Sequence, residues 1–482
     1  MTYSRSGASR LCRAMAFFLC LFLLSCISSP AIPEGTPGSL SVSVPKEVKG
    51  YSACTITVSA PAAGNAELLL HDSLGNPWLA RTESLSAGEN KLSWDGLGAN
   101  RERLMSGPYQ FDITLKADNG MEYSVSVPFS VKGFAPALAL ALPSSDMLYL
   151  DHGENWFVEC WVPSECAVVM EVRDAGNRVV YSCTASMKDP DRDIIRWDGT
   201  GKDRRQIAPG EYTVRLYAKA NPDFDHVYPL TVAETSPEIP AVTVTGPVIP
   251  ERGMSDEEIW EIMMRPSVVI NETGSSRRFE LKESPNARSA SVGLACCATQ
   301  ALEILSMEDG WAQVRTGNYS NGTLVTGWFP ANKLTVIVPA PHYGVLVDKA
   351  AQTLTLYQDG ARVCAIPVST GLPTDRYPWR ETTPGAFLTD VHFSPDFAQD
   401  GMRYEYPLRY QGGNIIHSTG FVRIPHAAYS VKDYSKNLPL LGQKASHGCV
   451  RISPFATADC PVNSYWLWTH LPYHTRVIIL DD

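Results

Sequence analysis

The stretch ASHGCVRI, at residues 445–452, places a hydroxyl, an imidazole, a glycine and a thiol in four consecutive positions near the C-terminal end of a 482-residue chain. A cysteine attacks only as its thiolate, and a nearby imidazole or cation lowers the thiol pKa. Gly448 removes the side chain where a substrate must come close. Backbone N–H groups beside a nucleophile can also stabilise an oxyanion. The stretch is therefore a candidate active-site turn. Its plain alternative is a cysteine in a half-buried strand beside a surface histidine.

Alternating apolar segments around this stretch predict a region of β-strands from residue 343 to residue 481. The segments GVLVD and QTLTLY form an expected hairpin around the turn at residues 349–351. A second turn leads into RVCAIPVS at residues 362–369, and TPGAF at residues 383–387 begins a further strand. The segment RVIIL at residues 476–480 is expected to close the region.

Several ordered motifs in this region resemble the YkuD-type L,D-transpeptidase catalytic domain. They are, in chain order, VDKAAQTLTLY, VSTG, TPGAF, NIIHSTG, LGQKASHGCVRIS and TRVIIL. The resemblance covers nearly the whole of residues 343–481. It implies a mostly-β catalytic domain with a cysteine nucleophile and an upstream histidine as general base. It implies no metal and no organic cofactor.

The resemblance assigns the nucleophile to Cys449 and leaves two candidates for the general base. His417 follows the apolar segment at residues 414–416 and precedes Ser418, which matches the family's Ile-His-Ser/Gly context. His426 lies in the segment IPHAA, which is typical of a surface loop or a helix start. We therefore expect His417 to be the base. Residues 421–440 are then an inserted loop that can bring His426 to the edge of the site.

Supporting roles follow from the resemblance and from the chemistry of each group. The carbonyl of Ser418 is expected to hold His417 in one tautomer. The N–H groups of Gly448 and Cys449 are expected to form an oxyanion hole. His447 either shapes the polarity of the site or only orients the loop.

Arg451 and three tyrosines each have two possible roles, and Ser446 completes the family motif. Arg451 either binds a substrate carboxylate bidentately or braces the loop. Ser446 stands in the Ser/Thr position of the family motif. The tyrosines that precede the histidine strand either line the cleft or pack in the core; they are Tyr404, Tyr406 and Tyr410.

The resemblance implies acyl transfer through a thioester. Cys449 attacks the carbonyl of the L-centred diamino acid of a peptidoglycan tetrapeptide stem, D-Ala leaves, and an amine of a second stem completes a 3→3 crosslink. Water as the acceptor would give an L,D-carboxypeptidase, and a protein amine would attach a protein to the wall. An inactive wall-binding scaffold is the main alternative, and the intact pair of His417 and Cys449 argues against it. A papain-like peptidase needs its cysteine before its histidine, whereas the order here is reversed.

The N-terminus predicts export. Three arginines precede a short apolar run at residues 14–24, which is too short for a comfortable transmembrane helix and is typical of a signal segment, here residues 1–25. The run ends in LLSC, which resembles a bacterial lipobox and implies cleavage before Cys26 and lipidation of its thiol. An ordinary secretory signal is the alternative. Residues 26–39, rich in Pro, Gly and Ser, predict a flexible tether.

The formal net charge of −10 argues against nucleic acid as a default partner and against adsorption to anionic lipid. Membrane attachment is therefore expected from the lipid anchor. The protein is expected at the outer face of the bacterial cytoplasmic membrane, in the periplasm or in the cell wall.

An internal repeat predicts two tandem β-sandwiches. Residues 93–117 and 196–220 share the sequence WDG, a glycine two positions later, a basic stretch, a Gly/Pro turn and a tyrosine-led strand. Short strands at regular spacing are typical of sandwiches, and the pattern resembles the immunoglobulin-like domains of the flagellar hook-capping family. We expect sandwiches at residues 40–133 and 134–233. Their tryptophans are expected in the core rather than against a ligand.

Residues 234–266 predict a Pro-rich linker that ends in a short helix. Ser255 can cap this helix, Glu258 can close a capping box, and Pro266 must end it. Residues 267–338 resemble a bacterial SH3-like domain, with a hairpin tip at residues 318–322. Such a domain binds wall peptide, positions the enzyme or serves only as a spacer. The whole chain is thus expected to be an all-β multidomain protein with two β-sandwiches, an SH3-like barrel and a mostly-β catalytic domain.

The cysteines show no spacing typical of a zinc site. The adjacent Cys296 and Cys297 are not expected to bridge each other. Export permits disulfides, and Cys160, Cys166 and Cys183 could supply one. Buried free thiols are the alternative.

Overall fold

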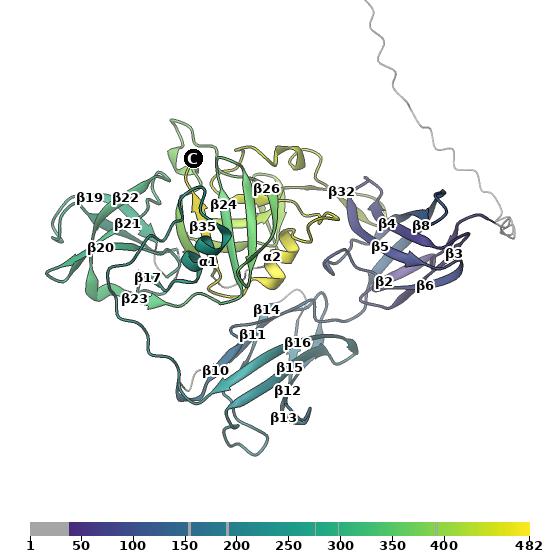
Figure 1. The fold of residues 1–482 in the computed structure, drawn as a ribbon, viewed down its shortest axis with the longest axis horizontal. Coiled ribbons are helices and arrows are strands. Elements are labelled where there is room, and N and C mark those ends of the chain that lie inside the picture. Colours follow the sequence, from purple (N-terminus) through teal and green to yellow (C-terminus); the bar gives the residue numbers. More distant parts are fainter. Residues whose placement is uncertain are drawn as a thin grey trace, which may run out of the picture.

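The computed structural model describes residues 38–152, 156–188, 192–274, 276–296, 298–390, 392 and 394–482 (Figure 1). The predicted signal segment, Cys26, all but the last residues of the tether and Cys297 lie outside these residues. Regular structure in the described part is almost entirely β-strand, which confirms the all-β multidomain prediction. None of the helices in these ranges is long and apolar enough to cross a membrane.

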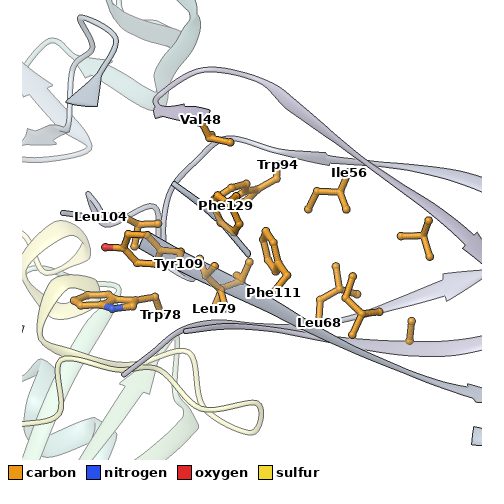
Figure 2. Packing of buried hydrophobic residues seen from close by; sticks show 14 of the residues in the cluster. Val48, Ile56, Leu68, Trp78, Leu79, Trp94, Leu104, Tyr109, Phe111 and Phe129 are labelled. Carbon is orange, nitrogen blue, oxygen red and sulfur yellow. The ribbon is translucent and has the colours of Figure 1, made fainter. Parts of the chain in front are cut away.

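The first repeat folds as two sheets around one apolar core, which we call the first sandwich. One sheet has the order β1-β3-β6 and the other the order β2-β8-β7-β4-β5. Alternate side chains of β4 and β7 point inward, and Trp94 packs edge-to-face on Phe111 and Phe129 in the centre (Figure 2). The strands are β1 Ser41–Ser43, β2 Glu47–Gly50, β3 Cys54–Ala60, β4 Gly64–Asp72, β5 Pro77–Leu85, β6 Gly88–Trp94, β7 Gly107–Ala117 and β8 Glu122–Phe134.

The second repeat forms the second sandwich in the same way. Its sheets have the orders β14-β11-β9 and β10-β16-β15-β12-β13. Trp197 is buried in its core, as Trp94 is in the first, so both tryptophans lie where the sequence predicted. The strands are β9 Leu140–Pro143, β10 Met147–Tyr149, β11 Trp156–Trp161, β12 Cys166–Asp174, β13 Val179–Met187, β14 Arg192–Trp197, β15 Gly210–Ala218 and β16 Asn221–Ala233.

Helix α1 (Asp256–Met264) follows the linker and begins and ends as predicted. The Ser255 side chain accepts from the Glu258 N–H, while the Glu258 carboxylate accepts from the Ser255 N–H, so the capping box is present. The helix ends before the Arg265–Pro266 step because the residue before a proline is pushed out of the helical region. Ile259, Ile262 and Met263 bury its apolar face against the C-terminal sheet.

The third unit pairs a five-stranded sheet, in the order β19-β18-β22-β21-β20, with the two strands β17 and β23 over one core. The turn at residues 318–323 joins β21 to β22, which confirms the predicted hairpin tip. The strands are β17 Ser267–Ile270, β18 Arg278–Lys282, β19 Ser291–Cys296, β20 Glu303–Glu308, β21 Trp311–Gly317, β22 Leu324–Pro330 and β23 Leu334–Ile337.

The C-terminal unit is built on an eight-stranded sheet in the order β27-β35-β24-β25-β26-β34-β31-β30, and it lies at the centre of the molecule (Figure 1). The sheet strands are β24 Tyr343–Asp348, β25 Thr353–Gln358, β26 Ala361–Ser369, β27 Gly385–Leu388, β30 Leu408–Gln411, β31 Asn414–Ser418, β34 Val450–Ile452 and β35 Arg476–Leu480. Two hairpins project from it, β28 Asp396–Gln399 with β29 Met402–Glu405, and β32 Val422–Pro425 with β33 Ser430–Asp433. Short 3₁₀ turns occur at Leu150–His152, Ala331–Lys333, Pro378–Arg380 and Leu438–Leu440.

Helix α2 (Ser464–His470) packs on the C-terminal sheet, and the sequence did not predict it. Its sequence SYWLWTH is short and rich in aromatic residues, which favour strands. The helix forms because the Asn463 side chain accepts from the N–H of Trp466 and because Leu467 is buried in the sheet core. Tertiary packing therefore overrides the local preference.

A disulfide joins Cys364 on β26 to Cys460, just before α2. The sequence left the disulfide pattern open and named Cys160, Cys166 and Cys183 as candidates. Those three cysteines are free thiols in the structure, with Cys160 buried and the other two half-buried. The bridge closes a long loop of chain, which restricts the unfolded ensemble.

The two sandwiches pack on different parts of the C-terminal unit. Phe421, Tyr434 and Phe455 complete the core of the first sandwich, and Trp78 meets Phe455 edge-to-face at 5.2 Å. Figure 2 shows Trp78 at the end of this core that faces the C-terminal chain. The second sandwich instead places Trp161 against Trp468 of α2, with ring centroids 5.4 Å apart.

Candidate active site

The strand order places Cys449 and His417 on one face of the C-terminal sheet. Strands β31 and β34 run parallel, with His417 opposite Arg451 and Ile416 opposite Val450. One further step along this register places Cys449 beside Ile415, whose backbone hydrogen-bonds the Cys449 thiol. Because side chains alternate between faces along a strand, residues 415 and 417 project from the same side as Cys449. The sheet thus brings together the predicted nucleophile and the predicted base.

The imidazole of His417 is buried and held in one tautomer. Its Nδ1 lies 2.7 Å from the Ser418 carbonyl oxygen. A carbonyl only accepts, so Nδ1 carries the proton and Nε2 presents a lone pair. Burial, assisted by the charge of Arg451, lowers the His417 pKa to about 3. The ring is therefore a neutral proton acceptor at physiological pH, and the predicted contact with Ser418 is present.

Two aromatic rings from the β28–β29 hairpin enclose this imidazole. Tyr404 meets His417 edge-to-face with centroids 4.9 Å apart, and Phe397 does so at 5.4 Å. The two rings also stack on each other at 5.1 Å. Nothing in the sequence marked Phe397, because its position follows from how this hairpin folds over β31. These rings exclude water from the base and fix its plane.

The other two tyrosines lie elsewhere. Tyr406 packs against Tyr465 and Trp468 beneath the second sandwich, so it does not line the site. Tyr410 is buried in the sheet core, with its ring 5.3 Å from Phe387. Burial raises the Tyr410 pKa well above the usual range. Of the three predicted tyrosines, only Tyr404 contacts the imidazole.

Cys449 as a residue is half-buried rather than enclosed in the sheet core. Desolvation of the sulfur by the surrounding protein raises the pKa of the Cys449 thiol above its ordinary value. The hydrogen bond with the Ile415 backbone and the charge of Arg451 oppose this shift only in part. The resting pair is accordingly a neutral thiol near a neutral imidazole. Such a pair reacts when the base removes the proton during attack rather than through a preformed thiolate.

The His-Gly-Cys turn is braced by Ser446. Its Oγ accepts from the Gly448 N–H at 3.1 Å and donates to the Cys449 carbonyl at 2.5 Å. Gly448 has φ +118°, which side chains rarely adopt, and a Cβ there would lie 3.1 Å from Asn414 Oδ1. Since Ser446 already occupies the Gly448 N–H, the oxyanion hole expected from two donors retains only the Cys449 N–H as a candidate.

Arg451 and His447 act around the turn rather than at the sulfur. Arg451 Nη1 donates to the Ala445 carbonyl at 3.3 Å, and its guanidinium lies over the Tyr404 ring, which favours the bracing role. His447 is about half exposed, and its Nδ1 lies 3.7 Å from the Asp400 carboxylate. Partial burial, together with the charges of Arg380 and Arg451, lowers the His447 pKa. His447 thus contributes to the polarity of the site entrance.

His426 is not brought to this site. It is exposed on the turn of the β32–β33 hairpin, where its ring stacks on Tyr429 at 4.4 Å. The inserted loop that carries it turns toward the first sandwich, because Tyr429 packs beside Gly107. The preference for His417 therefore agrees with the geometry.

Comparison with known proteins adds an identification to this geometry. Residues 342–479 match the family model described as the YkuD L,D-transpeptidase catalytic domain. This region is a YkuD L,D-transpeptidase domain. No curated protein matches the chain.

Solved L,D-transpeptidase structures are similar to the chain at low identity. The one from Xylanimonas cellulosilytica is 22% identical, with a TM-score of 0.20 over 29% of this chain and 60% of that chain. Those from Mycobacterium smegmatis and Mycobacterium tuberculosis are 16% and 15% identical, each with a TM-score of 0.22. They cover 57% and 45% of this chain, and 92% of each of those chains.

Within the YkuD domain, Thr382 ties the His-Gly-Cys turn to its neighbouring loop. The Thr382 hydroxyl accepts from the Gly371 N–H at 2.8 Å and donates to the Gly448 carbonyl at 2.9 Å. The sequence had placed residues 383–387 in a family motif and stopped one residue short of this threonine. The Thr382 side chain therefore holds the Gly448 carbonyl of the turn in place.

A buried ion pair supports the other side of the YkuD site. Lys432 Nζ lies 2.7 Å and 2.9 Å from the two Glu405 oxygens, and Tyr434 donates to the same carboxylate. The Glu405 N–H donates to Ser418 Oγ at 2.8 Å. Since the Ser418 carbonyl orients His417, this network connects the β32–β33 hairpin to the general base candidate. Sequence reasoning missed it because the two charges are 27 positions apart.

Proposed function

We propose that this protein is a peptidoglycan L,D-transpeptidase that forms 3→3 crosslinks through a thioester on Cys449. The observation that carries the proposal is the neutral, buried His417, with its Nε2 lone pair on the sheet face that also carries the partly exposed Cys449. The YkuD domain supports a transpeptidase-type enzyme, and this arrangement suits acyl transfer.

In the first half-reaction, the Cys449 thiol proton passes to Nε2 of His417 as the sulfur attacks the carbonyl of the diamino acid. An S–C bond forms, and the oxygen takes up negative charge near the Cys449 N–H. Collapse of this intermediate breaks the C–N bond to D-Ala. The imidazolium returns the proton to the departing amine.

In the second half-reaction, an amine of a second stem attacks the thioester carbon and gives its proton to His417. The S–C bond breaks, an amide forms, and the thiolate recovers the proton. Encirclement of His417 by Tyr404 and Phe397 keeps water from the base, which favours an amine over water as the acceptor.

The test is to incubate the purified protein with disaccharide-tetrapeptide and to weigh both the muropeptides and the protein. We expect a crosslinked dimer, free D-Ala, and a protein mass raised by the donor less D-Ala. Cys449→Ala should abolish all three products, and His417→Gln should lower the rate by about a thousandfold or more. His426→Gln, at the exposed hairpin, is the matched control and should leave the rate unchanged.

Product formation by Cys449→Ala would contradict the mechanism. Tripeptide without dimers would make the protein an L,D-carboxypeptidase instead. A protein whose mass never shifts, even with a carbapenem that acylates such thiols, would be an inactive wall-binding scaffold.

We further propose export and anchoring through a lipid on Cys26, with the first and second sandwiches as immunoglobulin-like domains and residues 267–338 as an SH3-like domain. The lipobox-like LLSC, the shared WDG repeat and the barrel-like third unit support these assignments. Labelling of expressing cells with a clickable fatty acid should mark the protein, and Cys26→Ser should remove the label. A labelled Cys26→Ser protein would refute the anchor.

A further inference from the structure

A loop of arginines and aromatic residues stands beside the nucleophile turn. It runs from residue 371 to residue 382, between β26 and β27. Its base is tied to the turn, because Gly371 bridges to Ser446 and the Leu372 N–H donates to the Ser446 carbonyl at 3.0 Å. Thr382 binds the Gly448 carbonyl from the other end of the loop. The loop and the Cys449 turn therefore form one connected unit.

The loop exposes a surface that its own fold does not use. Trp379 is 56% exposed and Leu372 is 50% exposed. The guanidinium groups of Arg380 and Arg376 lie over the Tyr377 ring at 4.2 Å and 5.1 Å. Throughout the described part of the chain, neither arginine pairs with a carboxylate. Tryptophan and arginine side chains are enriched at binding surfaces and contribute much of the binding energy there.

The carboxylates around this surface leave both guanidinium groups available. Glu381 is bound by Lys349 at 2.9 Å and faces Lys444 at 3.7 Å. Asp400 faces His447 from the opposite hairpin. Asp375 is exposed within the loop itself. On an acidic chain, this side of the entrance thus presents two arginines to an incoming carboxylate.

The strand order determines which part of a substrate would meet the loop. Strand β34 lies between β31, which carries His417, and β26, which leads into the loop. His417 must protonate the leaving amine and deprotonate the attacking amine, so both amines lie on the β31 side. The acyl chain that remains on the sulfur must then extend toward β26 and the loop.

We propose that residues 371–382 bind the acyl portion of the donor stem, with Arg376 and Arg380 pairing with its carboxylates and Trp379 and Leu372 covering its aliphatic parts. This assignment rests on the proposed function, since it takes the substrate to be a carboxylate-bearing stem peptide. Arginine suits the role because its planar fork matches a carboxylate bidentately.

The experiment measures the two half-reactions separately on the full-length protein. For the Arg376→Gln/Arg380→Gln variant, we expect the second-order rate of acylation by the tetrapeptide to fall at least tenfold. Attack of the acceptor amine on the preformed acyl-enzyme should keep its rate. Arg288→Gln, at an exposed arginine of the third unit, is the control for loss of a surface arginine and should change neither step.

A donor with amidated carboxylates supplies the decisive comparison. With this donor, the unmodified protein should be acylated no faster than the double arginine variant. Trp379→Ala should slow acylation by both donors alike. An equal loss with both donors for the arginine variant, or a change confined to the acceptor step, would overturn the assignment. An unmodified protein that forms no acyl-enzyme overturns the proposed function itself, whereas normal acylation of every variant overturns only the role of the loop.

Discussion

The two sandwiches share an internal design and differ in what they contact. Trp94 Nε1 donates to the Leu97 carbonyl, and Trp197 Nε1 donates to the Thr200 carbonyl, each at 2.9 Å and three residues ahead. The corner tyrosines repeat the same pattern. Tyr109 donates to the carbonyl four residues earlier at 3.0 Å, and Tyr212 does so at 2.8 Å.

Equivalent glycines show where the two repeats diverge. Gly107 and Gly210 have φ +152° and +149°, so their backbones agree. A Cβ on Gly107 would lie 3.0 Å from the Tyr429 ring of the YkuD hairpin, whereas a Cβ on Gly210 would meet nothing within 4 Å. One sequence pattern thus builds both folds, and surface residues outside the pattern decide the docking.

The consequence is that the first sandwich is connected to His417, the proposed general base, and the second is not connected in this way. Trp78 and Asn76 of the first sandwich hold the hairpin of Lys432, and Asn76 donates to the Lys432 carbonyl at 2.9 Å. Lys432 pairs with the Glu405 carboxylate, and the Glu405 N–H donates to Ser418 Oγ. The Ser418 carbonyl in turn accepts from His417. The second sandwich packs on α2 instead. Substitutions at equivalent positions of the two repeats should therefore have unequal effects.

Trp78→Ala should give the largest difference. The change removes a buried ring from the interface, which costs about 4 kcal/mol, and it releases the hairpin that supports His417. We expect a lower melting temperature by calorimetry and slower acylation of Cys449. Val180, at the matching place on β13, packs only within the second sandwich. Equal loss of activity in Val180→Ala would break the comparison.

Lys432→Met should have the next largest effect. It leaves the Glu405 carboxylate buried without its lysine partner, at a cost of about 3 kcal/mol. It should also reduce acylation, because the Glu405 N–H donates to Ser418, whose carbonyl orients His417. The Arg215–Asp225 pair on the second sandwich is partly exposed, so Arg215→Met should cost less than about 1 kcal/mol. Denaturation midpoints and acylation rates check both. Unchanged acylation of the Lys432→Met protein would show that the β32–β33 hairpin does not support His417.

Glu102→Gln should reveal a pH dependence confined to the first sandwich. Glu102 is buried against Asn463 of the YkuD domain, and burial raises its pKa from 4.5 to about 7. The folded state therefore holds a proton that the unfolded state has lost, and stability falls as pH rises from about 4.5 through 7. We expect Glu102→Gln to raise the melting temperature at pH 8, by a stabilisation on the order of 2 kcal/mol, and to matter little near pH 4.

The matched position in the second repeat is Arg205, which is exposed. Arg205→Gln should show no such pH dependence. A melting curve of Glu102→Gln that follows the unmodified protein at every pH would show that the carboxyl stays solvated.

Tyr109→Phe and Tyr212→Phe should give the smallest effects. Each removes one hydrogen bond, worth about 1 kcal/mol. The loss should be larger for Tyr109, which is 5% exposed, because the Met105 carbonyl then lacks a partner in a drier place. Calorimetry of the two variants checks the order, and a larger loss for Tyr212→Phe would reverse the interpretation.

Sequence alone determined the features that depend on local chemistry. Alternating residues predicted the strands, Ser255 and Glu258 predicted the capping box, and the motif with its upstream histidine singled out His417 and Cys449 as the candidate pair. The role of the Ser418 carbonyl was also accessible, because it lies next to His417 in the chain. These features need only neighbouring residues, whose geometry the backbone restricts to a few choices.

Tertiary structure alone decided the rest. Helix α2, the Cys364–Cys460 bridge and the separation of Tyr404 from Tyr406 depend on segments that meet only after folding. The same holds for the unequal docking of two sandwiches built from one repeat. A contact between distant segments depends on the register and shape of both surfaces at once, and no local pattern in either segment records that complementarity.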